Sequence, residues 1–116
     1  DFDNIQNIIR TVMVLGIIAF GMTMVMILGE IDLSVGSIAA FSCAFGGLFV
    51  NSESSAFVIL ATLSAGMFVG FLNGVGVAII KVPSLIMTLG TMAIIRNVGY
   101  VMTNGQAAYP TKLEIY

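Results

Sequence analysis

A few charged and polar side chains interrupt a sequence that is otherwise almost entirely apolar, and their types could do chemistry. Glu30 and Asp32 separate two apolar runs, Asn73 lies inside a third, and Arg96 lies inside the run 85–103. Carboxylate, guanidinium and amide groups are costly in an apolar environment unless they are paired, hydrogen-bonded or in contact with water. We therefore expect these side chains to hold helices together or to line a path for a polar solute.

The acidic pair has two interpretations, because no polar loop of ordinary length surrounds it. It lies either in a tight turn at one membrane surface or at a break inside a discontinuous helix. In the second case, Asp32 or Ser34 would cap the following helix, and Gly29 and Gly36 would permit a sharp entry. A helix N-terminus that faces a cavity near the midplane presents hydrogen-bond donors to a transported solute.

Arg96 and Asn73 also have two interpretations each. Arg96 either pairs with a carboxylate or a helix C-terminus, or it faces a wet path or snorkels to an interface, since it is expensive against lipid. Asn73 either donates hydrogen bonds across helices or lines the path. A structural role is the expected one for both residues, and the path is the alternative.

Catalysis is not predicted, and we assign no catalytic residue and no metal site. The sequence has no His and a single cysteine, Cys43, which we interpret as a small packing residue. No transition-metal or nucleophile–base cluster can be assembled from such a set. No glycine-rich loop ending in Lys-Ser or Lys-Thr is present, so ATP binding is not encoded in this stretch. The net charge of −2 also excludes nucleic-acid binding.

The elements that position these residues are predicted to be membrane helices. Charged residues make up 9% of the 116 residues, against about 25% in soluble domains, so the apolar surface must face lipid. A span in lipid must satisfy its own backbone, and no run alternates like a barrel strand. We predict an all-α integral membrane protein, a polytopic bundle of about four spanning or partly spanning helices. These helices are expected over residues 11–28, 33–50, 56–80 and 85–103.

The flanking segments are expected to lie outside the bilayer core. Residues 1–10 have apolar residues at helical spacing and are interpreted as an amphipathic segment at the membrane surface, and residues 104–116 as an extramembrane loop. Because the chain starts without Met and ends in a polar stretch, we expect it to be an internal fragment of a longer protein.

Three glycines in the third run share one spacing and are interpreted as packing residues. Gly66, Gly70 and Gly74 recur every four residues, which places them near one face of a helix. The absence of side chains there would let a neighbouring helix approach closely.

The residues 29–37, GEIDLSVGS, resemble the signature of the permease subunits of bacterial ABC importers for simple sugars, the group with ribose, galactose, xylose and autoinducer-2 permeases. The usual form has two glycines before IDLSVGS, and Glu30 departs from it. Further segments match in order and spacing: residues 4–27, 73–80, 81–96 and 100–106.

The resemblance implies a multi-pass permease of the bacterial inner membrane, about three times longer than this chain. It implies a second permease subunit, in a homodimer or heterodimer, a cytoplasmic ABC ATPase that binds ATP and Mg, and an extracytoplasmic solute-binding protein. It places residues 1–10 outside, Lys81 in the cytoplasm and residues 104–116 outside again, although the few basic residues do not support this orientation.

The leading hypothesis is a sugar permease with its path at the helix break. The candidate path residues are Glu30, Asp32, Ser34, Gly36, Ser37, Asn73 and Arg96. The alternatives are a permease for branched-chain amino acids or nucleosides, and a non-transporting membrane scaffold; an intramembrane enzyme is a distant third.

Overall fold

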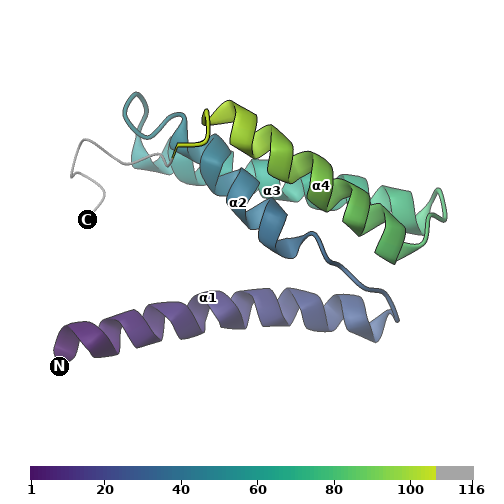
Figure 1. The fold of residues 1–116 in the computed structure, drawn as a ribbon. Coiled ribbons are helices and arrows are strands. Elements are labelled where there is room, and N and C mark those ends of the chain that lie inside the picture. Colours follow the sequence, from purple (N-terminus) through teal and green to yellow (C-terminus); the bar gives the residue numbers. More distant parts are fainter. Residues whose placement is uncertain (107–116) are drawn as a thin grey trace. The chain divides into compact units, whose positions relative to one another are not determined.

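Four α-helices make up residues 1–106, the part of the chain that the structure, a computed structural model, describes. They are α1 (Phe2–Ile27), α2 (Val35–Gly47), α3 (Ser55–Ala78) and α4 (Ser84–Met102) (Figure 1). Three of them, α1, α3 and α4, are long and apolar enough to cross a membrane. The prediction of an all-α, polytopic membrane bundle is therefore confirmed.

The chain divides into two compact units. The first, Asp1–Asp32, contains α1 alone, and none of the residues of this helix is buried. The second unit begins at Leu33, and its described part contains α2, α3 and α4.

Helix α1 runs without interruption through the segment that the sequence assigned to the membrane surface. Its 26 residues correspond to about 39 Å, more than a hydrocarbon core of about 30 Å. The two predicted segments 1–10 and 11–28 thus share one continuous helix, Phe2–Ile27, because neither Gly nor Pro lies near their junction. A position of residues 1–10 at the membrane surface stays a prediction.

Gly29 follows α1 at the predicted interruption, residues 29–32. Its φ of 75° lies in the left-handed region, and its N–H donates to the Met26 carbonyl at 2.9 Å. The Glu30 N–H reaches back to the Val25 carbonyl at 3.2 Å. A left-handed glycine with such backward hydrogen bonds is a common helix C-terminus.

Helix α2 is shorter than the predicted run 33–50. It has 13 residues, or about 20 Å, and is too short to cross the hydrocarbon core alone. Beyond Gly47 the backbone tightens, since Leu48 and Phe49 donate to carbonyls three residues back, at 3.2 and 3.1 Å. Residues 48–50 are still apolar, but the α-helical hydrogen bonding ends at Gly47.

Local capping explains the limits of the other two helices. Ser54 precedes α3, and its hydroxyl accepts from the Phe57 N–H at 3.3 Å. Lys81 has a φ of 67° in the turn after α3, and Pro83 occupies the N-cap position of α4. The predicted connections near 51–55 and 81–84 are therefore present. Of the predicted loop 104–116, residues 107–116 lie outside the described part.

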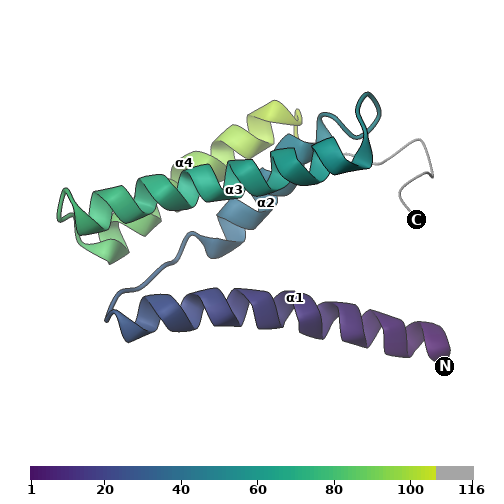
Figure 2. The ribbon, with the colours of Figure 1, turned by 180° about the vertical axis from the view of Figure 1, so that it is seen from behind.

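In the second unit, α2 packs against both α3 and α4. The chain reverses between α2 and α3 and again between α3 and α4, so α2 and α4 run in the same direction (Figures 1 and 2). Glycines sit at the contacts. A Cβ on Gly46 would collide with Thr62, one on Gly76 would lie 2.6 Å from Met87, and one on Gly99 would lie 3.6 Å from the Phe41 Cα.

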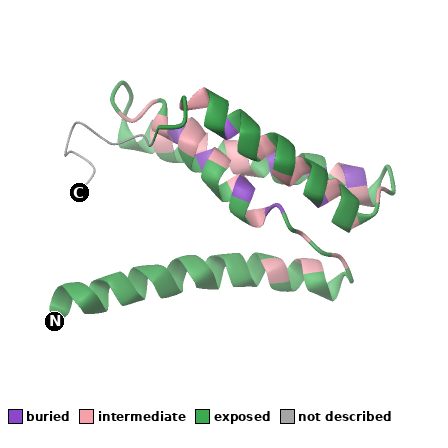
Figure 3. Ribbon diagram, viewed as in Figure 1, coloured by how far each residue is buried: buried purple, intermediate pink, exposed green. Residues whose placement is uncertain are grey.

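The interior of this three-helix unit is small and polar, and its exterior is apolar. Figure 3 shows the buried residues of the second unit as isolated patches on its three helices and the segment before them. Val69 is the one buried hydrophobic residue among residues 1–106. The buried polar residues are Ser34, Ser37, Ser42, Asn73 and Thr88. This distribution is typical of membrane bundles, where small residues and hydrogen bonds hold helices together.

The three predicted packing glycines differ in their surroundings. A Cβ on Gly66 would lie 3.0 Å from the Ser42 hydroxyl of α2, whereas Gly70 and Gly74 have nothing within 4 Å. A spacing of four residues turns by about 40° per step on a helix with 3.6 residues per turn. The row therefore drifts away from the face that α3 presents to α2. A packing role for Gly70 and Gly74 stays a prediction.

Candidate functional site

Asn73 joins the three helices of the second unit through its side-chain amide. Its Nδ2 donates to the Ser34 hydroxyl at 2.9 Å, before α2, and its Oδ1 accepts from the Thr91 hydroxyl of α4 at 2.5 Å. The Asn73 side chain is buried on α3. We call Ser34, Asn73 and Thr91 the polar node.

The sequence did not single out Thr91 as a member of the polar node. Its hydroxyl also donates to the Met87 carbonyl of its own helix, at 3.0 Å, as most hydroxyls in these helices do. Thr62 and Thr88 make the same bond four residues back, to Val58 and Ser84. The hydroxyl of a threonine in a helix can bond a carbonyl of its own helix and needs no other partner. Nothing in the sequence therefore indicated that Thr91 also bonds Asn73.

Ser34 occupies the N-cap position of α2, but its side chain makes no cap hydrogen bond. Of the two predicted caps, Asp32 or Ser34, the Ser34 option is therefore wrong: its backbone is already helical, with φ −89° and ψ −2°, rather than extended as in most N-caps. Its hydroxyl accepts from the Asn73 amide. Ser34 is fully buried, with 0% of its surface exposed. A side chain from another helix thus bonds the residue at the start of α2.

The other residues of the predicted break lie in different settings. Glu30 and Asp32 are half-buried in the first unit, and Asp32 has an interaction of its own. Gly36 lies in the first turn of α2 with ordinary backbone angles and nothing within 4 Å of an added Cβ. The flexibility predicted for the two glycines is therefore used at Gly29 alone.

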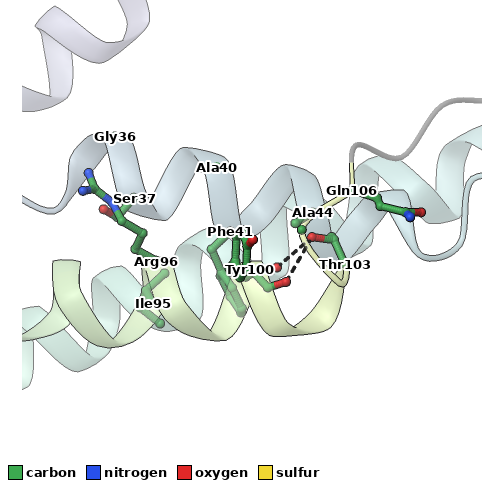
Figure 4. Close-up of a pocket in the computed structure, with 12 residues that line it drawn as sticks. Gly36, Ser37, Ala40, Phe41, Ala44, Ile95, Arg96, Tyr100, Thr103 and Gln106 are labelled. Carbon is green, nitrogen blue, oxygen red and sulfur yellow. Dashed lines mark hydrogen bonds between the residues drawn. The ribbon is translucent and has the colours of Figure 1, made fainter.

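A groove of about 360 Å³ lies between α2 and α4. At the end nearer the start of α2 it is lined by Ser37 and Arg96, and at the other end by Tyr100 and Gln106. Figure 4 shows the Arg96 side chain extended from α4 toward Ser37 and Gly36 on α2. Arg96 is exposed on the surface of the unit.

No acidic residue is available to Arg96 within these helices. Helices α2, α3 and α4 contain neither Asp nor Glu, and between Leu33 and Gln106 the one carboxylate is Glu53, in the turn before α3. A carboxylate partner from α2, α3 or α4 is therefore excluded, whereas pairing with a helix C-terminus or with a carboxylate outside these helices stays a prediction.

Ser37 carries an unused hydroxyl at the groove. Its side chain is 4% exposed, and its Oγ has no hydrogen-bond partner among residues 1–106. The Ser42 hydroxyl, five residues further along α2, also has no partner among the described residues. Buried hydroxyls without a partner are uncommon in folded proteins.

The arrangement offers hydrogen-bonding groups and no reactive pair. A buried amide, several hydroxyls and one guanidinium can bind and orient a polar molecule, but nothing here pairs a nucleophile with a base. Ser34, Ser37, Asn73 and Arg96 were predicted from the sequence, whereas Thr91, Ser42 and Tyr100 were not.

Comparison with known proteins identifies the family. The family model described as "Branched-chain amino acid transport system / permease component" matches residues 4–114. The chain is 42% identical to the ribose import permease protein RbsC of Haemophilus influenzae, over 90% of this chain and 32% of that protein. No solved structure matches the chain.

Two further relatives carry related names. The L-arabinose ABC transporter permease protein AraH of Azospirillum brasilense is 39% identical over 90% of this chain and 31% of its own length. The autoinducer 2 import system permease protein LsrC of Escherichia coli is 39% identical over 80% of this chain and 28% of its own length. The chain spans about a third of the length of these relatives. Together with the family model, these matches show that the chain belongs to the permease components of the branched-chain amino acid transport system family.

Proposed function

We propose that the full-length protein is the membrane-spanning permease subunit of an ATP-driven ABC importer for a simple sugar, a ribose-like monosaccharide. The observation that carries this proposal is the identity of 39 to 42% over 90% of the chain to permeases named for arabinose and ribose. The family description names branched-chain amino acids instead. We favour the sugar because the relatives that match this chain by sequence are named for sugars and for autoinducer 2.

The polar interior of α2, α3 and α4 supports a transport role. Five buried polar side chains and one buried hydrophobic one do not form the interior of a simple lipid anchor. A permease needs such groups, because a sugar leaves water only where hydrogen-bonding groups replace its hydration. The path would run near Asp32–Ser37, where helix α1 has ended and α2 begins.

The proposed assembly includes a second permease subunit, in a homodimer or a heterodimer. Two cytoplasmic ATPase subunits, or a fused tandem one, would bind ATP and Mg and drive the alternation between outward and inward openings. An extracytoplasmic solute-binding protein would deliver the sugar. This chain itself would perform no covalent chemistry.

The experiment is ATP-dependent accumulation in liposomes that contain the full-length permease with its ATPase and binding protein. The labelled solutes are ribose, arabinose, leucine and a nucleoside. Accumulation of one sugar that requires ATP supports the proposal and names the substrate. Accumulation of leucine alone moves the protein to the amino acid branch, and a verified assembly that accumulates nothing favours a non-transporting scaffold.

A further inference from the structure

We propose that the groove between α2 and α4 is a contact site for the monosaccharide itself, with Arg96 and Ser37 at one end and the rings of Phe41 and Tyr100 beside its middle and far end. This inference rests on the proposed sugar transport and adds the residues that touch the solute.

The charge of Arg96 argues that the groove is wet. An arginine at the centre of a membrane helix costs about 2.5 to 3.5 kcal/mol on insertion scales, so an arginine within a span, such as Arg96 in the second half of α4, faces a partner, a water-filled cavity or an interface. Helices α2, α3 and α4 supply no carboxylate partner. The Arg96 side chain extends instead along the groove toward the first turn of α2 (Figure 4).

The unused hydroxyl of Ser37 argues for a ligand at the same end. It lines the groove and has no partner among the described residues, whereas Thr88 and Thr91 on α4 bond carbonyls of their own helix. A sugar hydroxyl would satisfy Ser37 as donor or acceptor, and the five N–H donors of a guanidinium suit several hydroxyl oxygens at once.

The remainder of the groove fits the apolar face of a sugar ring. Phe41 and Tyr100 both line it. A Cβ added to Gly99 would lie 3.6 Å from the Phe41 Cα, so this glycine lets α4 lie close to α2. Gly105 has a φ of 71° and leaves room for the Tyr100 ring, because a Cβ added to Gly105 would lie 2.9 Å from the Tyr100 Oη. An apolar wall with a few polar groups is typical of small-molecule sites, which measure roughly 300 to 1,000 Å³, and the groove volume of about 360 Å³ falls in that range.

The first test is protection of an engineered cysteine in the full-length permease, cleared of other reactive cysteines by Cys43→Ser and equivalent changes. Ala40→Cys places a thiol in the groove, and Ala39→Cys places one on the adjacent exposed position of α2 outside it. The reagent is a small hydrophilic thiol reagent, added with the sugar that the wild-type assembly transports or with an equal concentration of a polyol that it does not transport.

We expect the transported sugar to slow the modification of Ala40→Cys at least about threefold and to leave Ala39→Cys unchanged, with no effect of the polyol on either. If Ala40→Cys is modified at the same rate with and without the sugar, the groove is not a contact site for the solute. If Ala40→Cys does not react at all, the proposal is also wrong, because another helix must then fill the groove.

The second test is uptake by Arg96→Gln, with Asn97→Ala as the matched control on α4. Asn97 is exposed, bonds its own helix through the Ala93 carbonyl and does not line the groove. Loss of one hydrogen bond from a charged group corresponds to about a tenfold loss or more, so we expect Arg96→Gln to reduce uptake about tenfold and Asn97→Ala to leave it near wild type.

The outcomes separate this inference from the proposed function. If the wild-type assembly accumulates a sugar but Arg96→Gln does so equally well, the groove is not a solute contact. If Arg96→Gln fails to assemble and neutralising a carboxylate elsewhere in the permease restores assembly and uptake, Arg96 is a structural ion-pair partner and the proposal is wrong. If the wild-type assembly accumulates no sugar, the proposed function itself fails.

Discussion

One amide side chain, that of Asn73, connects three helices that the chain brings together from distant positions. It donates to Ser34 and accepts from Thr91, 39 and 18 residues away in sequence. Hydrogen bonds between membrane helices contribute modestly, on average about 0.6 kcal/mol and at most about 1.7 kcal/mol each. Their directionality matters more here, because the two bonds together fix the rotation of α3 relative to its neighbours.

Replacement of this amide is the first residue-scale prediction. We expect Asn73→Ala to lower the free energy of unfolding of the full-length permease by about 1 to 3 kcal/mol, since two inter-helix bonds are lost. Asn97→Ala, which removes a bond within α4 alone, should cost less than about 0.5 kcal/mol. Thermal unfolding in detergent measures both. Equal melting temperatures for the two variants would show that the polar node does not stabilise the bundle.

Two glycines that flank the break are expected to respond oppositely to alanine. Gly29 has a φ of 75°, where a side chain costs about 1 to 2 kcal/mol. Gly36 has helical angles and open space, so alanine should stabilise α2 by up to about 1 kcal/mol. The same unfolding measurement compares Gly29→Ala with Gly36→Ala. A stabilising Gly29→Ala would contradict the backbone assignment at the end of α1.

At the scale of elements, α2 is the helix that depends most on its neighbours. It has 13 residues, it cannot span the membrane alone, and its buried positions are Ser37, Ser42 and Gly46. A short helix with small residues gains little from apolar burial, so close backbone approach and hydrogen bonds must hold it. The contact of Gly46 with Thr62 on α3 is the tightest of these approaches.

Alanine substitution of two glycines tests that dependence. A Cβ on Gly46 would collide with the Thr62 side chain, whereas one on Gly70 meets nothing within 4 Å. Overpacking of a tight contact costs about 1 to 3 kcal/mol, so Gly46→Ala should lower the melting temperature clearly and Gly70→Ala should not. Equal destabilisation by both would mean that Gly70 packs against a part of the permease outside this chain.

The periodic and compositional features of the helices could be predicted from the sequence. Apolar length and the GEID interruption located all four helices, and the end of α1 coincides with that interruption. The partner of Ser34 could not be predicted, because Asn73 lies 39 residues away in sequence and only the packing of α2 against α3 brings the two side chains together. The extent of α2 was also missed, since composition does not reveal where helical hydrogen bonding stops.

The glycine row illustrates the limit of a simple spacing argument. Gly66, Gly70 and Gly74 share a period of four, but the helix repeats every 3.6 residues, so the row winds around α3. The buried positions of that helix are Val69, Asn73 and Gly76 instead. They alternate steps of four and three, which keep closer to one face.

At the scale of the whole molecule, the chain is a multi-pass protein of the bacterial inner membrane that spans about a third of the length of the permeases it resembles. Large apolar side chains cover the outside of α1, α3 and α4, and the polar groups gather between α2, α3 and α4. Lipid and the rest of the permease would cover the apolar surface. In our proposal, the start of α2 and the groove beside it contact the solute.

The measurement that tests this account most directly is ATP-driven uptake by the full-length permease with Asp32→Ala and Ser34→Ala combined, assembled with its ATPase and binding protein. The matched control, Glu53→Ala with Ser54→Ala, also removes one carboxylate and one N-cap serine, but at the turn before α3. We expect the first pair to reduce sugar uptake about tenfold or more with normal membrane insertion, and the control pair to retain most of it. Unchanged uptake in a properly inserted Asp32→Ala, Ser34→Ala permease would contradict the assignment of the solute path to this break.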